Sequence, residues 1–390
     1  MQFTRLLKPP KHSFFLFGPR GTGKSTWVKQ VLPKALTFDL LDTALALRLT
    51  RNPHELESLI GHRPAEQWIV IDEIQKIPLL LDEVHRLMEN HRWYFTLSGS
   101  SARKLRRGGA DLLAGRALQK NMEGFTFAEL ADEWDLNHAL EWGSLPLIWT
   151  SRKNAAEILD AYLHTYLREE IREEGIVRQY PPFVRFLTIA GQMNGQVVNG
   201  SNIAREAEVP RASVDGYFSI LVDTLMGHFL PAYQPRLKVR ERAHPKFYWF
   251  DAGVARAAAG NLFQPLDSSV KGYSLESWIF HELRVYNEVA RKHKKIAYYH
   301  TTGNQEIDFV IERTNRQGER PPHLVCLEVK LSKRWKSEWE KPARALAAEK
   351  GVKVDRMIGI YMGSETLRIH GFDIYPVNEF LRRLHAGDIF

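Results

Sequence analysis

Short apolar runs alternate with helix-like stretches through the first part of the chain. The runs at residues 13–17, 68–71 and 93–97 consist mostly of apolar residues, which is the pattern of strands buried on both faces of a sheet. Residues 25–32, directly after the first run, carry apolar side chains at helical spacing. Strands that alternate with helices predict an α/β fold.

The pattern becomes helical from residue 127 to about residue 174, and apolar residues recur at helical spacing in residues 155–167. This region is expected to form a helical lid after the sheet. Arg168 and Arg172 lie one turn apart on one helical face. They face either a ligand or a neighbouring subunit, or they pair with the adjacent glutamates, which is the simpler interpretation.

Two short helices joined by a tight connection are predicted at residues 201–210 and 211–221, which is a helix-turn-helix pattern. Ser201 suits the cap of the first helix and Pro210 the start of the second. Beyond them, residues 235–242 alternate between basic and other residues, as in a strand with one basic face. That face would carry Arg236, Lys238, Arg240 and Arg242.

A recognition helix followed by a basic strand indicates a winged helix whose wing lies along the phosphate backbone of DNA. The alternative is a winged helix that contacts protein and has a solvated edge strand. Crowded basic side chains on one strand face repel each other unless an anion is near, and this favours DNA.

The C-terminal region returns to strand-like patterns. Residues 306–311 and 324–331 predict two strands, and residues 275–283 predict an amphipathic helix before them. Glu328 and Lys330 lie on one strand face because side chains alternate along a strand. With Asp308, and with Glu276 from the helix, they predict a divalent-metal site. Pairing of these carboxylates with surface lysines is the alternative.

Composition narrows the class of protein. A chain of 390 residues can bury two or three cores. The single Cys326 excludes an internal disulfide and a multi-thiolate zinc site, so we expect a cytoplasmic setting. The sequence shows no signal peptide and no apolar stretch of about 18 residues, so no membrane partner is expected. The formal charge of +8 favours a polyanionic partner only weakly.

The segment from Gly18 to Ser25 fits the phosphate-binding pattern G-x-x-x-x-G-K-[ST], and it lies between a predicted strand and a predicted helix. Glycines let backbone N–H groups approach a polyphosphate, and the helix N-terminus adds its positive end. Lys24 would reach the β- and γ-phosphates of a nucleotide, and Ser25 would bind Mg²⁺. The expected nucleotide contacts are Gly18, Pro19, Arg20, Gly21, Thr22, Gly23, Lys24, Ser25 and Thr26.

Polar residues also follow the next two predicted strands, at the edge where open α/β sheets bind their ligands. Asp72 would hold Mg²⁺, and Glu73 would polarise the attacking water. Ser98 is the candidate sensor of the γ-phosphate. Arg116 is the first candidate for an arginine finger, acting in its own subunit or in a neighbour's, although a solvated basic face is the simpler interpretation.

These motifs carry a family resemblance. The phosphate loop, the acidic strand at residues 68–73, the segment at residues 96–105 and the later Glu-x-Lys motif resemble prokaryotic AAA-type ATPases joined to a C-terminal nuclease-like domain. The C-terminal arrangement resembles the restriction-endonuclease-like PD-(D/E)xK fold. The resemblance implies an ATPase core at 1–126, a helical lid at 127–180, a winged helix at 181–260 and a nuclease-like domain at 261–390.

The resemblance and the arginines together favour an ATPase that uses ATP and Mg²⁺ to act on DNA as a homo-oligomeric motor or remodeller. The alternative is an ATP-dependent switch, in defence or signalling, whose C-terminal domain binds protein or DNA without cutting. DNA stimulation of ATP hydrolysis distinguishes the two.

Overall fold

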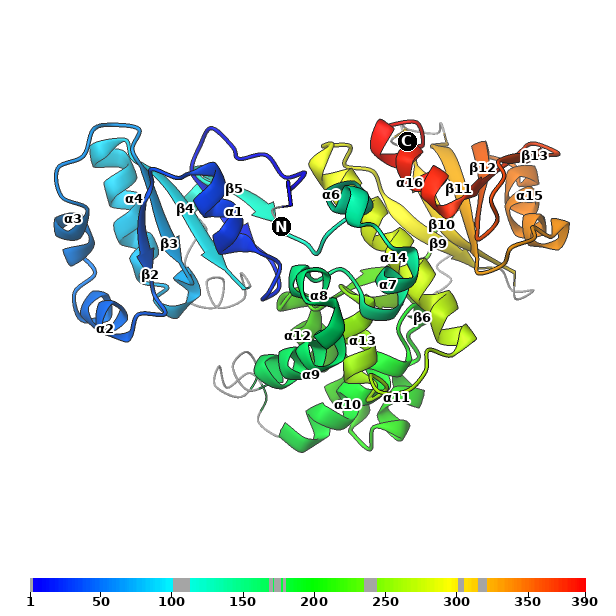
Figure 1. Cartoon of the computed structure of the whole chain (residues 1–390), viewed down its shortest axis with the longest axis horizontal. Coiled ribbons are helices and arrows are strands. Elements are labelled where there is room, and N and C mark those ends of the chain that lie inside the picture. Colours follow the sequence, from blue (N-terminus) through cyan, green and yellow to red (C-terminus); the bar gives the residue numbers. More distant parts are fainter. Residues whose placement is uncertain are drawn as a thin grey trace.

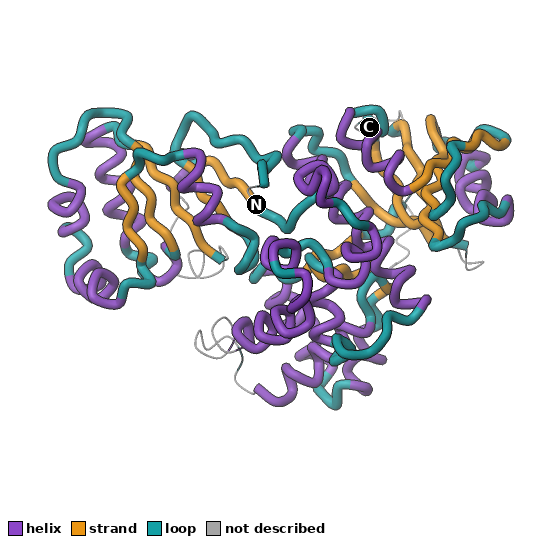
Figure 2. Tube along the Cα trace, viewed as in Figure 1, coloured by secondary structure: helices purple, strands orange, loops and turns teal. Residues whose placement is uncertain are grey.

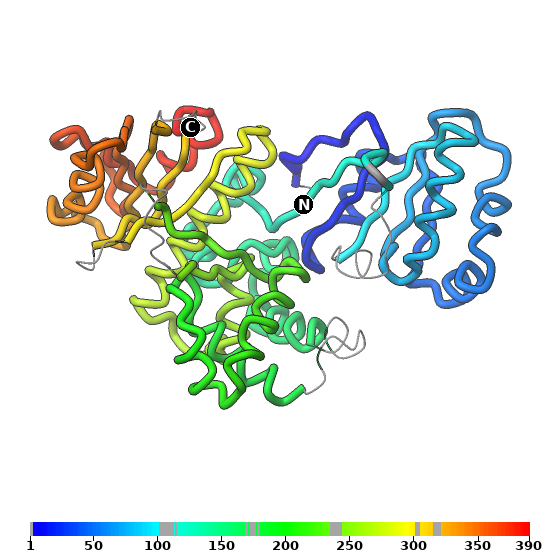
Figure 3. Tube along the Cα trace, turned by 180° about the vertical axis from the view of Figure 1, so that it is seen from behind, coloured from blue at the N-terminus to red at the C-terminus, as the bar shows by residue number. Residues whose placement is uncertain are grey.

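The computed structural model describes residues 3–100, 113–167, 171, 177, 180–234, 244–300, 305–314 and 321–390 of the chain. These residues form an N-terminal lobe (up to residue 126), a mainly helical middle lobe (127–260) and a C-terminal lobe (261–390) (Figure 1). The two large sheets lie at opposite ends of the molecule, with the middle lobe between and below them (Figure 2). From behind, the middle lobe adjoins the C-terminal lobe closely (Figure 3).

The N-terminal lobe contains a five-stranded parallel sheet with the order β2-β3-β4-β1-β5. The three apolar runs form strands of this sheet, so the predicted α/β fold with buried parallel strands is confirmed. The strands are β1 (Phe14–Phe17), β2 (Leu36–Asp39), β3 (Trp68–Asp72), β4 (Tyr94–Gly99) and β5 (Leu118–Asn121), and the helices are α1 (Lys24–Val31), α2 (Thr43–Arg51), α3 (Glu55–Ile60) and α4 (Leu80–His91).

Strand β1 is buried on both faces because helices cover both sides of the sheet. Phe14 and Leu16 pack in one cluster with Trp27 of α1. Phe15 and Phe17 point to the other face, in the cluster that contains the buried residues of α4. Removing this much apolar surface from water holds the start of the phosphate loop at the centre of the sheet.

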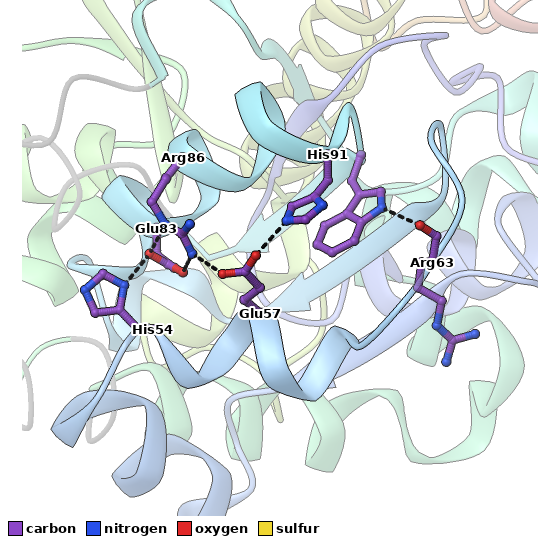
Figure 4. A network of polar contacts seen from close by, with 7 residues as sticks. His54, Glu57, Arg63, Glu83, Arg86 and His91 are labelled. Atoms are coloured by element: carbon purple, nitrogen blue, oxygen red, sulfur yellow. Dashed lines mark hydrogen bonds and ion pairs between the residues drawn. The ribbon is translucent and has the colours of Figure 1, made fainter.

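A network of ion pairs joins α3 to α4 on the surface of the N-terminal lobe (Figure 4). Arg86 pairs with Glu83 and with Glu57, and His91 Nε2 lies 2.6 Å from Glu57 Oε1. The side chains of Arg86 and Glu57 are 37% and 38% exposed. Water therefore screens the pair of Arg86 with Glu57, whereas Glu83 is buried.

The middle lobe is mainly helical, with one small sheet. Its two short helices α11 and α12 match the predicted helix-turn-helix segment, and an antiparallel sheet of order β6-β8-β7 lies beside them. The elements are α6 (Phe127–Leu130), α7 (Leu136–Trp142), α8 (Pro146–Thr150), α9 (Ala155–Thr165), α10 (Tyr180–Gln192), β6 (Gln196–Val197), α11 (Gly200–Glu206), α12 (Arg211–Asp223), β7 (Gly227–Leu230), β8 (Lys246–Trp249) and α13 (Ala252–Ala258).

The C-terminal lobe contains a six-stranded mixed sheet with the order β13-β14-β12-β11-β10-β9. Strands β9, β10 and β11 are antiparallel, whereas β12 runs parallel to β11. The elements are α14 (Ser268–Val289), β9 (Ile296–His300), β10 (Glu306–Glu312), β11 (His323–Lys330), α15 (Lys341–Ala348), β12 (Lys353–Tyr361), β13 (Leu367–Ile369), β14 (Phe372–Pro376) and α16 (Val377–Ala386). The helix and the two strands predicted here are therefore confirmed as elements.

The middle and C-terminal lobes share one hydrophobic core, since a single cluster of buried residues runs from Phe125 to Phe390. The segment after β7 also covers the edge of the C-terminal sheet. There, the backbone N–H of Tyr233 donates to Tyr298 O, and the N–H of Tyr298 donates to Pro231 O. An edge strand that is paired in this way exposes fewer unpaired backbone groups.

Helix α14 connects the C-terminal lobe to the N-terminal lobe. Glu288 accepts hydrogen bonds from the backbone and side-chain nitrogens of Asn121, the last residue of β5. One turn earlier, Arg284 donates to Glu123 at 2.6 Å. Burial opposes the charge on Glu123, but Arg284 and two nearby histidines outweigh it and lower the pKa of Glu123 to about 2. This contact is therefore a buried ion pair.

Several sequence predictions fall on residues outside the described ranges. They are the basic strand with Arg236, Lys238, Arg240 and Arg242, and the arginines Arg168 and Arg172. Within the described part of the chain, none of the helices combines the length and the apolar character that crossing a membrane requires.

Candidate nucleotide-binding site

The phosphate loop connects β1 to α1, as its sequence pattern predicts. Gly21 and Gly23 adopt positive φ values of 75° and 88°, a region that favours glycine. At Gly18 a Cβ atom would lie 2.2 Å from the carbonyl oxygen of Met122, so the close approach of β5 also requires glycine. The loop is thus fixed by its own turns and by the neighbouring strand.

Lys24 points back into the loop. Its Nζ donates to the carbonyl oxygens of Gly18 at 2.7 Å and Pro19 at 3.0 Å. Thr22 Oγ1 also donates to Pro19 O, at 2.9 Å. The ammonium group therefore lies within the loop that would surround a polyphosphate, held by neutral acceptors.

Asp72 joins the phosphate loop to the sensor strand. It is the last residue of β3, and its Oδ2 accepts a hydrogen bond of 2.6 Å from the Ser25 hydroxyl. Its Oδ1 accepts another of 2.6 Å from the Ser98 hydroxyl of β4. Three residues far apart in the sequence therefore meet at the carboxyl edge of the sheet, as the strand order requires.

Glu73 follows Asp72 in a left-handed conformation with φ 58° and ψ 42°, which is uncommon for a residue with a Cβ. Its carboxylate is buried and accepts a hydrogen bond from Gln75, which also donates to Ser100. Burial raises the pKa of Glu73, although Lys24 partly opposes the shift. A carboxylate with a raised pKa accepts a proton more readily.

A cavity of about 620 Å³ opens beside the loop. Arg20, Gly21 and residues 23–27 of the loop and α1 contribute to one wall, and Glu73 also lines the cavity. Its other wall comes from Phe3, Arg5, Phe125, Pro146, Leu147 and Thr150. A volume in this range accommodates a cofactor-sized ligand.

Arg5 links the cavity wall to the loop. Its guanidinium donates to Thr22 O at 2.7 Å and to Glu123 O at 2.6 Å, and it pairs with Glu129 at 3.0 Å. It also stacks over the ring of Phe125. Sequence reasoning did not identify Arg5, because it precedes the loop without any motif of its own. Gln75 was also missed, although it lies two residues after Glu73.

Most of the residues predicted for the nucleotide site lie together in the structure, but Arg116 does not. Lys24, Ser25, Asp72, Glu73 and Ser98 come together at one edge of the sheet. Arg20 and Thr26 also line the cavity. Arg116, in contrast, pairs with Glu89 of α4 at 2.6 Å and does not line the cavity.

The four residues predicted for a C-terminal metal site also come together. Lys330 pairs with Glu328, and its Nζ lies 3.7 Å from Asp308 Oδ2. Carboxylate oxygens of Glu276, Glu306 and Asp308 lie within 4.8 Å of one another. Glu306 was missed, although its position two residues before Asp308 on the same strand face is a signal that could have identified it.

Lys246 of β8 enters this cluster from the middle lobe. Its Nζ lies 2.7 Å from Glu276 Oε1 and also pairs with Glu306. Tyr248 donates a hydrogen bond to Glu276. Burial raises the pKa of Glu276 to about 7, although Lys246 opposes the shift. The oxygens suit a divalent cation, but two ammonium groups hold them, so the residues as arranged do not fit a bound metal.

Comparison with protein families supports the class of the N-terminal lobe. Residues 10–131 match a family model described as an AAA domain. Residues 133–264 and 271–380 match two domains of unknown function, DUF8612 and DUF4143. Together with the loop geometry, the first match supports an AAA-type P-loop ATPase lobe. The C-terminal match does not support the predicted nuclease-like domain.

Among curated proteins, the chain is similar to Uncharacterized protein Rv2008c of Mycobacterium tuberculosis and Uncharacterized protein Mb2031c of Mycobacterium bovis. Each is 27% identical over 309 residues, which cover 77% of this chain and 68% of the relative. Neither name assigns an activity.

Among solved structures, the ORC1 protein of Aeropyrum pernix in complex with DNA is 16% identical, with a TM-score of 0.26, over 66% of this chain and 88% of that one. A Signal Transduction ATPase with Numerous Domains protein from Pyrococcus horikoshii is 10% identical, with a TM-score of 0.20, over 72% of this chain and 45% of that one. Likeness at this level carries no argument.

Proposed function

We propose that this protein binds ATP with Mg²⁺ and hydrolyses it. The observation that carries the proposal is the pair of hydrogen bonds that Ser25 and Ser98 donate to Asp72, next to the phosphate loop and its cavity. Serine and carboxylate oxygens at this position are the donors that Mg²⁺ prefers in P-loop sites. The donor set therefore fits the ion.

The loop supplies the phosphate contacts. Lys24 exchanges its two carbonyl acceptors for the β- and γ-phosphate oxygens, which accept stronger, charge-assisted hydrogen bonds. The N-terminus of α1 adds its dipole at the same point. Ser25 and Asp72 would hold Mg²⁺, which would supply positive charge against the phosphates.

Glu73 orients the attacking water. It lies directly after Asp72 and lines the cavity beside Lys24 and Ser25. Burial raises its pKa, so it takes a proton from water more readily than an exposed glutamate does. Gln75 holds its carboxylate, and Ser98 holds Asp72.

The test is ATP hydrolysis by the purified full chain with Glu73→Gln as the comparison. Removing a general base costs about 10²- to 10⁴-fold in rate, so we expect kcat to fall by at least about 100-fold while nucleotide binding persists. The exposed Glu338→Gln serves as the matched control and should hydrolyse normally. Equal rates in Glu73→Gln and the unaltered protein would remove Glu73 from the mechanism.

DNA is the proposed partner. The support is the helix-turn-helix pair α11 and α12 with its small antiparallel sheet, which together suit a winged helix, and the formal charge of +8. Assembly as a homo-oligomer, with Arg116 reaching a neighbour's nucleotide, is the proposed way of coupling hydrolysis to movement. Stimulation of hydrolysis by single-stranded, duplex or branched DNA would identify the form recognised.

One observation favours the second candidate, an ATP-dependent switch whose C-terminal lobe binds protein or DNA without cutting. The mixed sheet suits a restriction-endonuclease-like fold, yet Lys246 and Lys330 hold the carboxylates that cleavage would need. A switch binds ATP tightly and turns over slowly until an effector arrives. A flat response to DNA, with hydrolysis still lost in Glu73→Gln, would therefore support the switch.

A further inference from the structure

Lys246 is a cation buried in a pocket of carboxylates. Its side chain is 3% exposed, and its Nζ pairs with Glu276 and Glu306. The ammonium also lies over the ring of Tyr298, 5.6 Å from the centroid. Burial opposes the charged form, but Glu276, Asp308 and Glu306 together outweigh it and raise the pKa of Lys246. The lysine is therefore charged.

The cluster that receives it has more carboxyl groups than ammonium groups. It contains four carboxylates (Glu276, Glu306, Asp308 and Glu328) and, among the described residues, two ammonium groups (Lys246 and Lys330). Burial and the neighbouring Asp308 raise the pKa of Glu328 well above its usual range. The oxygens are of the kind that divalent cations bind, and binding of a cation would displace the protons that these raised pKa values favour.

The position of Lys246 depends on how the middle lobe is attached. Strand β8 pairs with β7 and β6, and the segment after β7 bonds to the backbone of Tyr298 at the sheet edge. Tyr248, two residues after Lys246 on the same strand, donates to Glu276 as well. Strand β8 thus places two donors in the cluster from outside the C-terminal sheet.

We propose that Lys246 occupies the cation position of this cluster, so that β8 of the middle lobe and a divalent metal ion compete for the same carboxylate oxygens. The C-terminal lobe binds no metal while β8 is attached. Its carboxylates instead form the binding site for Lys246 of the middle lobe. Replacing the ammonium group by a neutral side chain makes these carboxylate oxygens available to Mg²⁺, Ca²⁺ or Mn²⁺. This inference does not depend on ATP hydrolysis.

The test compares the full-length protein without nucleotide against Lys246→Ala and Lys246→Gln, titrated with CaCl₂ or MnCl₂. Thermal unfolding and the electron paramagnetic resonance signal of bound Mn²⁺ are the two readouts. We expect both variants to unfold at lower temperature than the unaltered protein and to be restored in part by the divalent ion. The unaltered protein should show neither stabilisation nor bound Mn²⁺.

Two controls define the site. Adding Glu306→Gln to either variant should abolish the metal response, whereas Lys295→Ala, which removes an exposed lysine beside Glu312, should create none. Metal binding of equal strength to the unaltered protein would overturn the proposal, since Lys246 would not be competing. Absence of metal binding in both variants, or failure of both to fold even with metal, would overturn it as well.

Discussion

The nucleotide site and the C-terminal cluster each contain a buried lysine near carboxylates at strand ends, but the two lysines have different partners. Lys24 donates to two neutral carbonyl oxygens beside a cavity of about 620 Å³. Lys246 is held by charged oxygens, and its side chain is 3% exposed. Neutral acceptors yield to a phosphate, whereas charged ones compete with any incoming ligand. We therefore expect these direct partners to distinguish the two lysines, although Lys24 also interacts electrostatically with Glu73.

Substituting each lysine by methionine should give the largest difference between the two sites. Lys246→Met leaves buried carboxylates without a counter-charge, so the free energy of unfolding should fall by about 3–5 kcal/mol. Lys24→Met should change unfolding by less than about 1 kcal/mol but weaken nucleotide binding by roughly 10- to 100-fold, the cost of lost charge-assisted hydrogen bonds. Denaturant unfolding and titration with a fluorescent nucleotide measure the two effects. The exposed Lys29→Met is the control, and the comparison fails if the two variants behave alike.

A pH series sharpens the comparison at Glu276. Burial raises its pKa from 4.5 to about 7, so between these values the folded protein binds more protons than the unfolded chain. This contribution to stability is fully present below pH 4.5 and is lost as the pH rises through 7. Glu276→Gln should remove this pH dependence, so the change in the free energy of unfolding between pH 4.5 and 7 should shrink by up to about 3 kcal/mol. Urea titrations at a series of pH values measure this free energy of unfolding. If it depends on pH equally in Glu276→Gln and the unaltered protein, Glu276 does not titrate in this range.

The surface network provides the smallest expected effect. Arg86→Ala breaks the ion pairs with Glu83 and Glu57, but Glu57 is 38% exposed and the buried Glu83 keeps its contact with His54 (Figure 4). The free energy of unfolding should fall by less than about 1 kcal/mol, and added salt should reduce the difference further. Unfolding at low and high salt measures this. A loss as large as that of Lys246→Met would mean that exposure does not separate the two kinds of ion pair.

The meeting of Ser25, Asp72 and Ser98 at one edge of the sheet could be predicted because its signals are local. The phosphate loop, Asp72 with Glu73, and Ser98 each lie at the end of an apolar run, and parallel strands bring such ends to one edge. Arg5 and Lys246 could not be predicted in the same way. Each acts on residues that are far away in the sequence, and neither belongs to a periodic pattern that names its partner.

Four members of the C-terminal cluster were predicted, but Glu306 and the cation Lys246 were not. Alternation along a strand placed Glu328 beside Lys330, and the order of elements brought Asp308 and Glu276 to them. What the sequence did not supply was the cation from β8, because contact between two lobes depends on tertiary packing. The acidic residues alone therefore favoured a metal site that the packed structure fills with a lysine.

Helix α14 rigidly connects the carboxylate cluster to the N-terminal lobe. Glu276, near its middle, lies in the carboxylate cluster, and Glu288, near its end, binds Asn121 beside the phosphate loop. The twelve residue steps from Glu276 to Glu288 span about 18 Å of continuous helix, at 1.5 Å per residue. Because one helix carries both Glu288 and Glu276, a displacement of β5 would move α14 as a rigid body and so displace Glu276 in the carboxylate cluster. Spin labels on the exposed surfaces of the two outer lobes would thus report that movement as a change in a single distance.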